Sequence, residues 1–368
     1  MSPHPDVIVI GGGAVGTACA RALSIRGTTV LLIDRERTPG EGWRASAGML
    51  AAQVEAEPED PLLGLTVAGR TFYRENAGLL HERTGIDIGL DECGILQVAL
   101  TEEAAVAAKA KVAWQRQQAH RADWLSPQEV AEGWPWLASG MGAFWAPEDG
   151  VVDPANLVTA LRRDAQLAGA TIVQDVVGSI ESAKGRITGV QGERDRYDAP
   201  TVVVAAGAWS GRIAGLPRPL SVEPVRGQMI AFSWPADTPA VVAYGPRCYL
   251  LRRGDEMLVG ATMEHAGFDP SVTPDATATL IRRASAIHPA LRDATPRRAW
   301  AGLRPGTPDG LPIIGAEPRL AGLWYATGHG RNGILLAGVT GEMIAQQVRG
   351  DAEAADLRVV RPERFWNW

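Results

Sequence analysis

Residues 6–16 read Asp6-Val-Ile-Val-Ile-Gly-Gly-Gly-Ala-Val-Gly16, a short apolar strand that runs directly into a G-x-G-x-x-G turn. Residues 17–26 then have the composition of a helix. Val30-Leu-Leu-Ile33 follows as a second strand and ends on Asp34. This order of strand, turn, helix and strand, with an acid at the end, is typical of a dinucleotide-binding βαβ unit. The glycine turn alone is weak evidence, but the complete unit is specific.

Each part of this unit has a physical task in binding a dinucleotide. Gly11 allows the tight turn, Gly13 lets the backbone approach a pyrophosphate, and Gly16 lets the helix pack closely on the strand. The N-terminus of the helix offers free N–H groups and a positive dipole to the phosphates. Asp34 can accept hydrogen bonds from ribose hydroxyls, which favours an adenosine ribose without a 2′-phosphate.

Composition restricts the class of protein. The chain has 368 residues, enough for one large or two medium domains at about 150 residues each. Its net charge of −6 argues against binding to nucleic acid or to an anionic membrane surface. The three cysteines and six histidines show no metal-ligand spacing, so we expect no metal. The scattered cysteines and the lack of a signal peptide or apolar span predict a cytoplasmic protein.

The order of elements predicts two domains that are each discontinuous. Helices are expected at 62–83, 101–120, 153–168 and 275–288, an irregular connection at 124–145, and an antiparallel sheet within 221–263. We therefore expect an α/β protein with a Rossmann-like cofactor domain and a β-rich antiparallel substrate domain. The expected boundaries are 1–85, 146–220 and 305–368 for the first domain, and 86–145 and 221–304 for the second.

A second glycine turn lies near the end of the chain. Leu323-Trp-Tyr-Ala326 predicts a strand, Gly328-His-Gly-Arg-Asn-Gly333 repeats the spacing of the opening turn, and a helix is expected from Ile334 to about residue 348. No strand ending in an acid follows, which argues against a second dinucleotide. The pattern favours one long cofactor touched at both ends, with the last helix pointing its N-terminus at a flavin ring. An ordinary strand–turn–helix remains the alternative.

The sequence resembles the glycine oxidase and D-amino-acid oxidase family of FAD-dependent enzymes, most closely the glycine oxidases of thiamine biosynthesis. The resemblance runs from residue 6 to about residue 348. The matching segments are Ala45–Leu50, Val151–Pro154, Pro224–Gln228, Val259–Met263, Trp300–Gly310 and Gly328–Ala337. Two of them are the most specific, Trp300-Ala-Gly-Leu-Arg-Pro305 and Arg331-Asn-Gly333.

The resemblance implies a set of cofactor contacts. Alongside Gly11, Gly13 and Gly16 of the first turn, the residues expected to touch FAD are Ala14 and Val15 at that turn, Asp34 and Arg35 at the ribose, Gly42, Trp43, Ala47, Gly48 and Met49 along the flavin, Val177 at the adenine, and His329, Gly330, Arg331, Asn332, Gly333, Ile334 and Leu335 at the flavin ring. The small residues of 40–53 fit this role, although composition alone allows a simple loop equally well. FAD is expected to be non-covalent, since no cysteine lies near Arg304 in the sequence and 40–52 holds no histidine.

The resemblance also implies a substrate site. Arg304 would bind the substrate carboxylate with help from the hydroxyl of Tyr249, and Arg331 and Met263 would line the pocket. Arginine suits this task because its planar fork binds a carboxylate bidentately. From the sequence alone, Arg304 could instead pair with a surface acid, and Tyr249 fits a strand core better.

Two residues depart from the family pattern. Arg247 stands where histidine is usual, and Gly330 stands where a bulky aromatic residue is common. Both flank the expected pocket, so their effect on its size, and with it the preferred substrate among glycine, sarcosine and small D-amino acids, is left open.

The expected activity is oxidation of glycine, other small amines or D-amino acids by FAD and molecular oxygen. The products would be an imine or 2-oxo acid, ammonia and hydrogen peroxide, and the imine could supply thiazole synthesis of thiamine. A D-amino-acid dehydrogenase or a sarcosine-type oxidase with another electron acceptor is the nearest alternative, and a non-catalytic FAD-binding protein is a more distant one. The oligomeric state, including a homo-oligomer, is left open.

Overall fold

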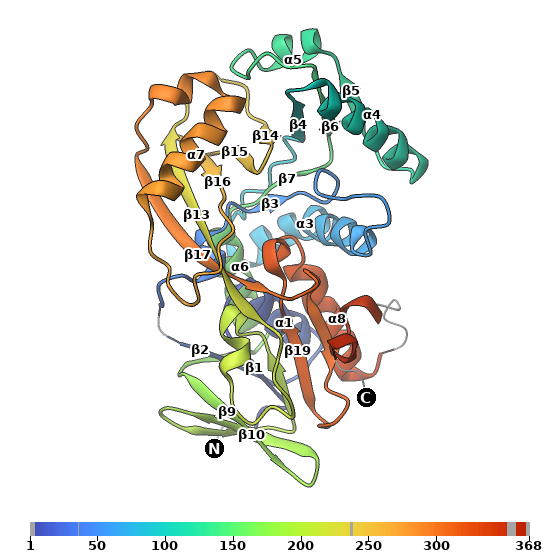
Figure 1. Cartoon of the computed structure of the whole chain (residues 1–368). Helices are drawn as coiled ribbons and strands as arrows, with labels where there is room; N and C mark the ends of the chain where they lie inside the picture. Colours follow the sequence, from blue (N-terminus) through green and yellow to red (C-terminus); the bar gives the residue numbers. More distant parts are fainter. Residues whose placement is uncertain (1–3, 36, 236–237, 352–357, 366–368) are drawn as a thin grey trace.

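Six strands form the sheet that carries the glycine turns. The computed structural model describes residues 4–35, 37–235, 238–351 and 358–365. The strand order is β18-β19-β12-β1-β2-β8, parallel throughout except where β18 meets β19 (Figure 1). The strands are β1 (Val7–Ile10), β2 (Val30–Asp34), β8 (Thr171–Gln174), β12 (Thr201–Val204), β18 (Ile313–Ala316) and β19 (Leu323–Thr327). The predicted Rossmann-like core is therefore confirmed.

The two faces of this sheet bury alternate residues of the same strands. Val7 and Val9 of β1 pack toward helices, whereas Ile8 and Ile10 pack toward a small sheet on the other face. The helices are α1 (Ala14–Ile25), α3 (Leu63–Thr84), α6 (Pro154–Leu167) and α8 (Ala337–Arg349), and the small sheet consists of β9 (Val177–Ala183), β10 (Arg186–Gly192) and β11 (Arg196–Asp198). Burial on both faces explains why these strands are continuously apolar.

Helix α6 shows how local sequence sets an element. The Asp153 carboxylate accepts hydrogen bonds from the N–H groups of Ala155 and Asn156, at 2.8 and 3.0 Å, and Pro154 occupies the first helical position. Asp153 is therefore the N-cap of this helix, and Pro154 fits the first position because the N–H that proline lacks has no intrahelical partner there. The helix is then fixed on α1 by a buried ion pair, in which Arg21 Nε lies 2.7 Å from Asp164 Oδ2.

The second sheet has eight strands in the order β17-β13-β16-β15-β14-β4-β6-β5 (Figure 1). Neighbouring strands are antiparallel except for the parallel pair β14 and β4, so the predicted antiparallel sheet is confirmed in its main character. The strands are β4 (Ile95–Ala99), β5 (Asp123–Leu125), β6 (Gly142–Ala146), β13 (Glu223–Ser233), β14 (Val242–Gly245), β15 (Cys248–Arg253), β16 (Glu256–Gly260) and β17 (Arg298–Gly306). Helices α4 (Glu102–Gln117), α5 (Pro127–Gly133) and α7 (Pro274–Ile287) pack around it.

Two expectations about the elements are wrong, and one segment for which no element was predicted is a strand. The irregular connection expected at 124–145 contains most of β5 and β6 and all of α5, which begins with a capping box between Ser126 and Glu129. The Gly/Pro-rich segment around Arg304 is strand β17. The last helix begins at Ala337 and not at Ile334, because Gly330–Asn332 forms a short 3-10 turn (η3) before it.

The division into two domains remains a proposal. We propose the boundaries given above because the six-stranded sheet takes its strands from 1–85, 146–220 and 305–368. The eight-stranded sheet takes its strands from 86–145 and 221–304, apart from the last residues of β6 and β17. Most of the eight-stranded sheet lies in the upper half of Figure 1 and the six-stranded sheet in the lower half.

Candidate active site

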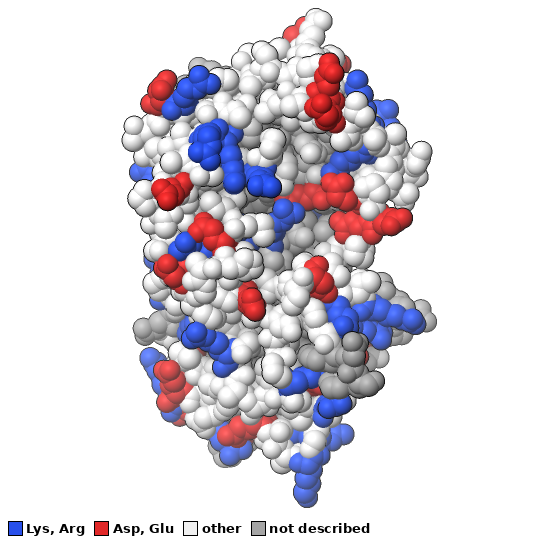
Figure 2. Space-filling model, in the orientation of Figure 1, with Lys and Arg blue, Asp and Glu red and all other residues white. Residues whose placement is uncertain are grey.

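A single cavity of about 760 Å³ extends from the first glycine turn to the eight-stranded sheet. At one end its wall includes Gly11 to Val15 and Asp34, and at the other end it includes Tyr249 and Arg304. Figure 2 shows a hollow near the middle of one face, with basic side chains on one side and acidic side chains on the other. A cavity of this size is a usual location of a small-molecule or cofactor site.

The first turn is built to receive a phosphate group. Helix α1 has no side-chain cap at Gly13, so side chains leave its first N–H groups free for an anion. A Cβ on Gly13 would lie 3.3 Å from Trp43, which shows how close the cavity wall comes. A Cβ on Gly16 would lie 1.8 Å from the carbonyl oxygen of Gly11, so Gly16 serves the packing of helix on strand. Gly16 is accordingly not part of the cavity wall.

Asp34 at the end of β2 is held from two sides. Its Oδ1 accepts the N–H of Gly12 at 3.0 Å, and its Oδ2 lies 3.3 Å from Nη1 of Arg162. The carboxylate still lines the cavity and retains lone pairs for ribose hydroxyls. Beside it, the guanidinium of Arg35 stacks on the ring of Trp209 at 3.7 Å, and Val177 reaches the same end of the cavity.

The small-residue loop, residues 40–53, is fastened to the eight-stranded sheet. It contains α2 (Gly42–Ala45) and β3 (Met49–Leu50), which pairs with β7 (Gly150–Val151). Trp300 Nε1 donates to the carbonyl of Ala45 at 3.1 Å. Nη2 of Arg253, on β15, donates to the carbonyls of Ala47 and Val152 at 2.7 and 2.8 Å. These hydrogen bonds hold Ala47, Gly48 and Met49 against the cavity.

The closing glycine turn brings His329 to the opposite wall. The side chain is 2% exposed, and its Nε2 lies 3.1 Å from Oγ1 of Thr340 on α8. Burial lowers the pKa of His329 to about 3, so the imidazole is neutral at physiological pH. Gly330, Arg331, Asn332, Gly333 and Ile334 also line the cavity. Leu335 does not; its side chain is buried in the core between the helices.

Arg304 and Tyr249 form the far end of the cavity. Nη1 of Arg304 donates to the carbonyl of Thr262 at 3.0 Å, and its guanidinium covers Gly227, where a Cβ would lie 2.2 Å away. Among the described residues Arg304 has no acidic partner within ion-pair distance. Burial raises the pKa of Tyr249, and Arg304 opposes this shift, so the two groups lie close together. The surface ion pair considered for Arg304 is therefore not formed.

Three side chains make a polar cluster at the mouth. Arg331 Nη2 lies 2.8 Å from Glu55 Oε2, and the Tyr244 hydroxyl donates to Glu55 Oε1 at 3.3 Å. The pKa of Tyr244 is raised to about 12, mainly by burial and to a lesser extent by the negative charge of Glu55. Met263 lines the same region with 63% of its surface exposed. Arg331 thus lines the cavity with its positive charge balanced by Glu55.

Sequence reasoning missed several residues of the cavity wall. They are Glu55, Trp209, Arg212, Gly227, Met229, Tyr244, Cys248 and Arg283, and Arg247 was noted only as a departure from the family pattern. Cys248 was considered remote from Arg304 in the sequence, yet it lies on the wall next to Tyr249. Its thiol is 2% exposed, and burial raises its pKa to about 12, so it is protonated and unreactive at neutral pH.

Comparison with known proteins agrees with this geometry. A family model described as FAD dependent oxidoreductase (DAO) matches residues 6–347. The chain belongs to this family. The family is a flavoprotein family, and the cavity fits FAD because it joins an uncapped phosphate turn, an acid at the end of β2 and the second glycine turn. The N-terminus of the last helix, expected at the flavin ring, is not on the cavity wall, because α8 begins at Ala337 and the wall is formed by His329 to Ile334. The expected enzyme class, an FAD-dependent amino-acid oxidase, is confirmed by this family and by its glycine oxidase members.

Three relatives illustrate the similarity of this DAO-family chain. The glycine oxidase of Geobacillus kaustophilus is 34% identical over 97% of this chain and 96% of its own, and a crystal structure of it superimposes with a TM-score of 0.93. The bifunctional protein ThiO/ThiG of Synechocystis sp. is 35% identical over 99% of this chain, which spans only 55% of that protein. The iminodiacetate oxidase of Chelativorans sp. BNC1 is 27% identical, covers 97% of this chain and 98% of its own, and has a TM-score of 0.89.

Two negative findings complete the comparison with the expectations. Within the described ranges, no group of His, Cys, Asp and Glu side chains has the arrangement of a metal site. In the same ranges, none of the helices has both the length and the apolar character needed to cross a membrane.

Proposed function

We propose that this protein oxidises small amino acids, glycine first, with molecular oxygen as electron acceptor. One observation carries the proposal: Arg304 is a cation without an acidic partner among the described residues, and it faces the same cavity as the FAD-binding elements. A buried guanidinium needs a counterion, and the carboxylate of an amino acid supplies one with bidentate geometry. Tyr249 then offers a protonated hydroxyl to the same carboxylate.

The cavity residues act by position and electrostatics. Arg304 and Tyr249 fix the carboxylate, which directs the α-carbon toward the wall formed by Ala47 to Met49 and His329. Neutral His329 adds no positive charge there. Held by the turn at Gly11–Val15 and by Asp34, FAD would supply the two-electron oxidation of the amine, with oxygen as the final acceptor and hydrogen peroxide as its product. Water converts the imine to the 2-oxo acid, glyoxylate in the case of glycine, and ammonia.

The role in thiamine biosynthesis is the finer part of the proposal. Its support is the similarity to about half of the bifunctional protein ThiO/ThiG of Synechocystis sp., of which the chain spans 55%. An imine made from glycine could supply thiazole synthesis in the same compartment. The three cysteines are unpaired, which supports the expected cytoplasmic location.

The main alternative function is oxidation of the same kind of substrate with an electron acceptor other than oxygen. A D-amino-acid dehydrogenase or a sarcosine-type oxidase would use the same Arg304, and Arg247 alters the mouth of the cavity at a position where glycine oxidases usually carry histidine. Neither feature distinguishes oxygen from another acceptor.

One screen tests the proposal. The FAD-loaded protein is mixed anaerobically with glycine, sarcosine, D-alanine and the carboxylate-free methylamine, and flavin absorbance is followed. We expect bleaching by the amino acids and little by methylamine. Stoichiometric peroxide after admission of air supports the oxidase. Rapid turnover only with an artificial acceptor would favour the dehydrogenase, and a flavin that none of these amines reduces would contradict the proposed function.

A further inference from the structure

The substrate end of the cavity holds more positive charge than a simple amino acid requires. Four arginines line it: Arg247, Arg283, Arg304 and Arg331. Glu55 neutralises Arg331 at 2.8 Å. The single carboxylate of glycine is bound by Arg304 in the proposed function. Arg247 and Arg283 are then left over, and neither has an ion pair with an acid anywhere in the described residues.

The two remaining arginines are held together by the fold. Arg247 is the second residue of the two-residue turn between β14 and β15, where Gly245 pairs with Cys248 and Arg247 has a φ of 56°. Arg283 on α7 donates from Nη1 to the carbonyl of Arg247 at 3.3 Å. Ile287 packs beneath the same turn, where a Cβ on Gly245 would lie 2.7 Å from its Cδ1. The turn is therefore fastened to α7.

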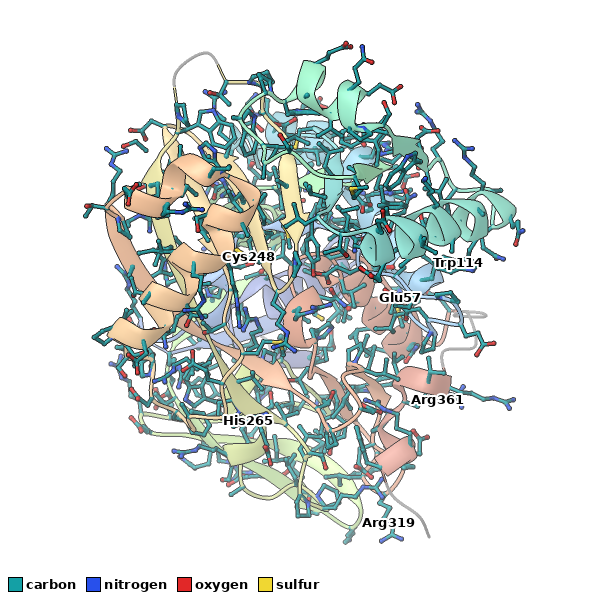
Figure 3. All side chains as sticks on the ribbon, turned by 45° about the horizontal axis from the view of Figure 1, so that its top comes forward. Glu57, Trp114, Cys248, His265, Arg319 and Arg361 are labelled. Atoms are coloured by element: carbon teal, nitrogen blue, oxygen red, sulfur yellow. The ribbon has the colours of Figure 1, made fainter. Side chains whose placement is uncertain are left out.

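The position of this pair is set by its neighbours. Cys248 follows Arg247 directly, and Arg283 lowers the pKa of the Cys248 thiol against the larger effect of burial, so its charge lies close to the cavity wall. Figure 3 shows Cys248 beside α7 and Glu57 beside α4. Figure 2 shows basic side chains gathered on the α7 side of the hollow. Arg283 contacts the backbone of Arg247, and both residues line the cavity, so two positive charges without an acidic partner face the same space and would attract an anion there.

We propose that Arg247 and Arg283 bind a second acidic group of the substrate, so that the preferred substrates are amino dicarboxylates. This rests on the proposed function, in which Arg304 binds the first carboxylate. The second group would be carried on a short arm, either on the nitrogen, as in iminodiacetate, or on the side chain, as in D-aspartate. Both share one chemistry, an oxidisable amine between two carboxylates.

The inference makes a quantitative statement about selectivity. A charge-assisted hydrogen bond to a carboxylate, formed in a cavity partly screened from water, changes affinity by tenfold or more. A substrate with the same carbon chain but no second carboxylate does not receive this contribution. Because Arg247 is exposed, its share should weaken as salt is raised.

The test measures second-order rate constants for anaerobic reduction of the flavin in the FAD-loaded protein. Iminodiacetate is compared with N-ethylglycine, and D-aspartate with D-asparagine, which distinguishes the two arms. At low salt, we expect at least one dicarboxylate to react tenfold faster than the comparison substrate that lacks the second carboxylate. Arg247→Gln and Arg283→Gln should each reduce that ratio several-fold, and raising salt should reduce it in the unmodified protein.

Arg282→Gln is the matched control, because Arg282 lies beside Arg283 on α7 but is exposed and not part of the cavity wall. It should leave the ratio unchanged, and FAD content verifies that each variant is folded. Equal rate constants for the dicarboxylate and its comparison substrate in both pairs would overturn this inference. A rate ratio that neither Arg247→Gln nor Arg283→Gln reduces would also overturn it. In either case, bleaching of the flavin by glycine would still support the proposed function. A flavin reduced by no amino acid overturns both.

Discussion

Glu55 and Arg331 form an ion pair with 2.8 Å between Oε2 and Nη2, although 276 residues separate them in the chain. The pair joins the loop after β3 to the closing glycine turn. It leaves Arg304 as the cation at this end of the cavity that is both deeply placed and unpaired among the described residues. The family resemblance placed Arg304 and Arg331 in one pocket. Because Glu55 pairs with Arg331, only Arg304 of these two offers an unpaired charge to a substrate carboxylate.

The first prediction concerns Asp34. Asp34→Ala should weaken FAD binding by about 1–3 kcal/mol, because the N–H of Gly12 loses its acceptor and the ribose loses a hydrogen-bond partner. The rate at saturating FAD should stay near normal, since the substitution is far from Arg304. Fluorescence titration of the apoprotein with FAD measures the effect. Asp198→Ala, on the exposed strand β11, is the control and should bind FAD normally.

The second prediction concerns attachment of the cofactor. Acid precipitation should release all FAD into the supernatant, because Cys248, the cysteine on the cavity wall, is buried and protonated. Absorbance of the supernatant and the pellet measures the distribution. Flavin that stays with the pellet would contradict non-covalent binding, and its loss in Cys248→Ala would then identify the attachment point.

Local patterns predicted the first βαβ unit because every determinant lies within residues 6–34. The glycines, the helix start and Asp34 act over one βαβ unit, so sequence alone contains them. Strand β17 was not predicted because it contains two glycines and Pro305, residues that are uncommon inside strands. It is the edge strand of its sheet, where Pro305 costs less than in a central strand, because one side of an edge strand forms no ladder hydrogen bonds.

Glu55 could not be predicted because distant residues fix its position. The backbone N–H groups of Gln53 and Val54 both donate to the carboxylate of Asp149, about which no local pattern gives a signal. Arg247 was visible as a departure from the family pattern, but only the fold shows that Arg283 of α7 lies beside it. Hydrophobic periodicity and short motifs cannot predict which distant side chains the fold brings into contact.

The third prediction follows from this buried network. Asp149 is fully buried and accepts from Arg70 Nη1 at 2.8 Å as well as from Gln53 and Val54. Asp149→Asn should lower the free energy of unfolding by about 3 kcal/mol, because the buried guanidinium loses its closest counter-charge. Urea unfolding of the FAD-loaded protein measures this. Asp123→Asn, which alters an exposed ion pair with Arg116, should cost little.

The fourth prediction is a pH dependence from His329. Its pKa is about 3 in the folded protein and about 6.5 in the unfolded chain, so the unfolded chain binds more protons between these values. Stability should therefore fall as the pH falls from 6.5 toward 3. His329→Gln should reduce the loss between pH 7 and pH 5 by about 2 kcal/mol.

The measurement for His329 is urea unfolding of the apoprotein at several pH values. His81→Gln, an exposed substitution on α3, should leave the acid limb unchanged. If the His329 variant loses as much stability on acidification as the unmodified protein, the imidazole is not the group that resists protonation in the fold.

The last prediction concerns Arg304. Arg304→Lys should raise the apparent KM for glycine in proportion to a loss of about 1–3 kcal/mol and leave FAD affinity intact, because lysine keeps the charge but loses the bidentate fork. Steady-state kinetics and FAD titration measure the two effects. Arg298→Lys is the matched control on the same strand, where Arg298 pairs with Glu256 at the surface. A carboxylate-free amine should be a poor substrate and respond little to Arg304→Lys. If glycine and that amine lose equally, Arg304 supports the structure of β17 and does not bind the substrate.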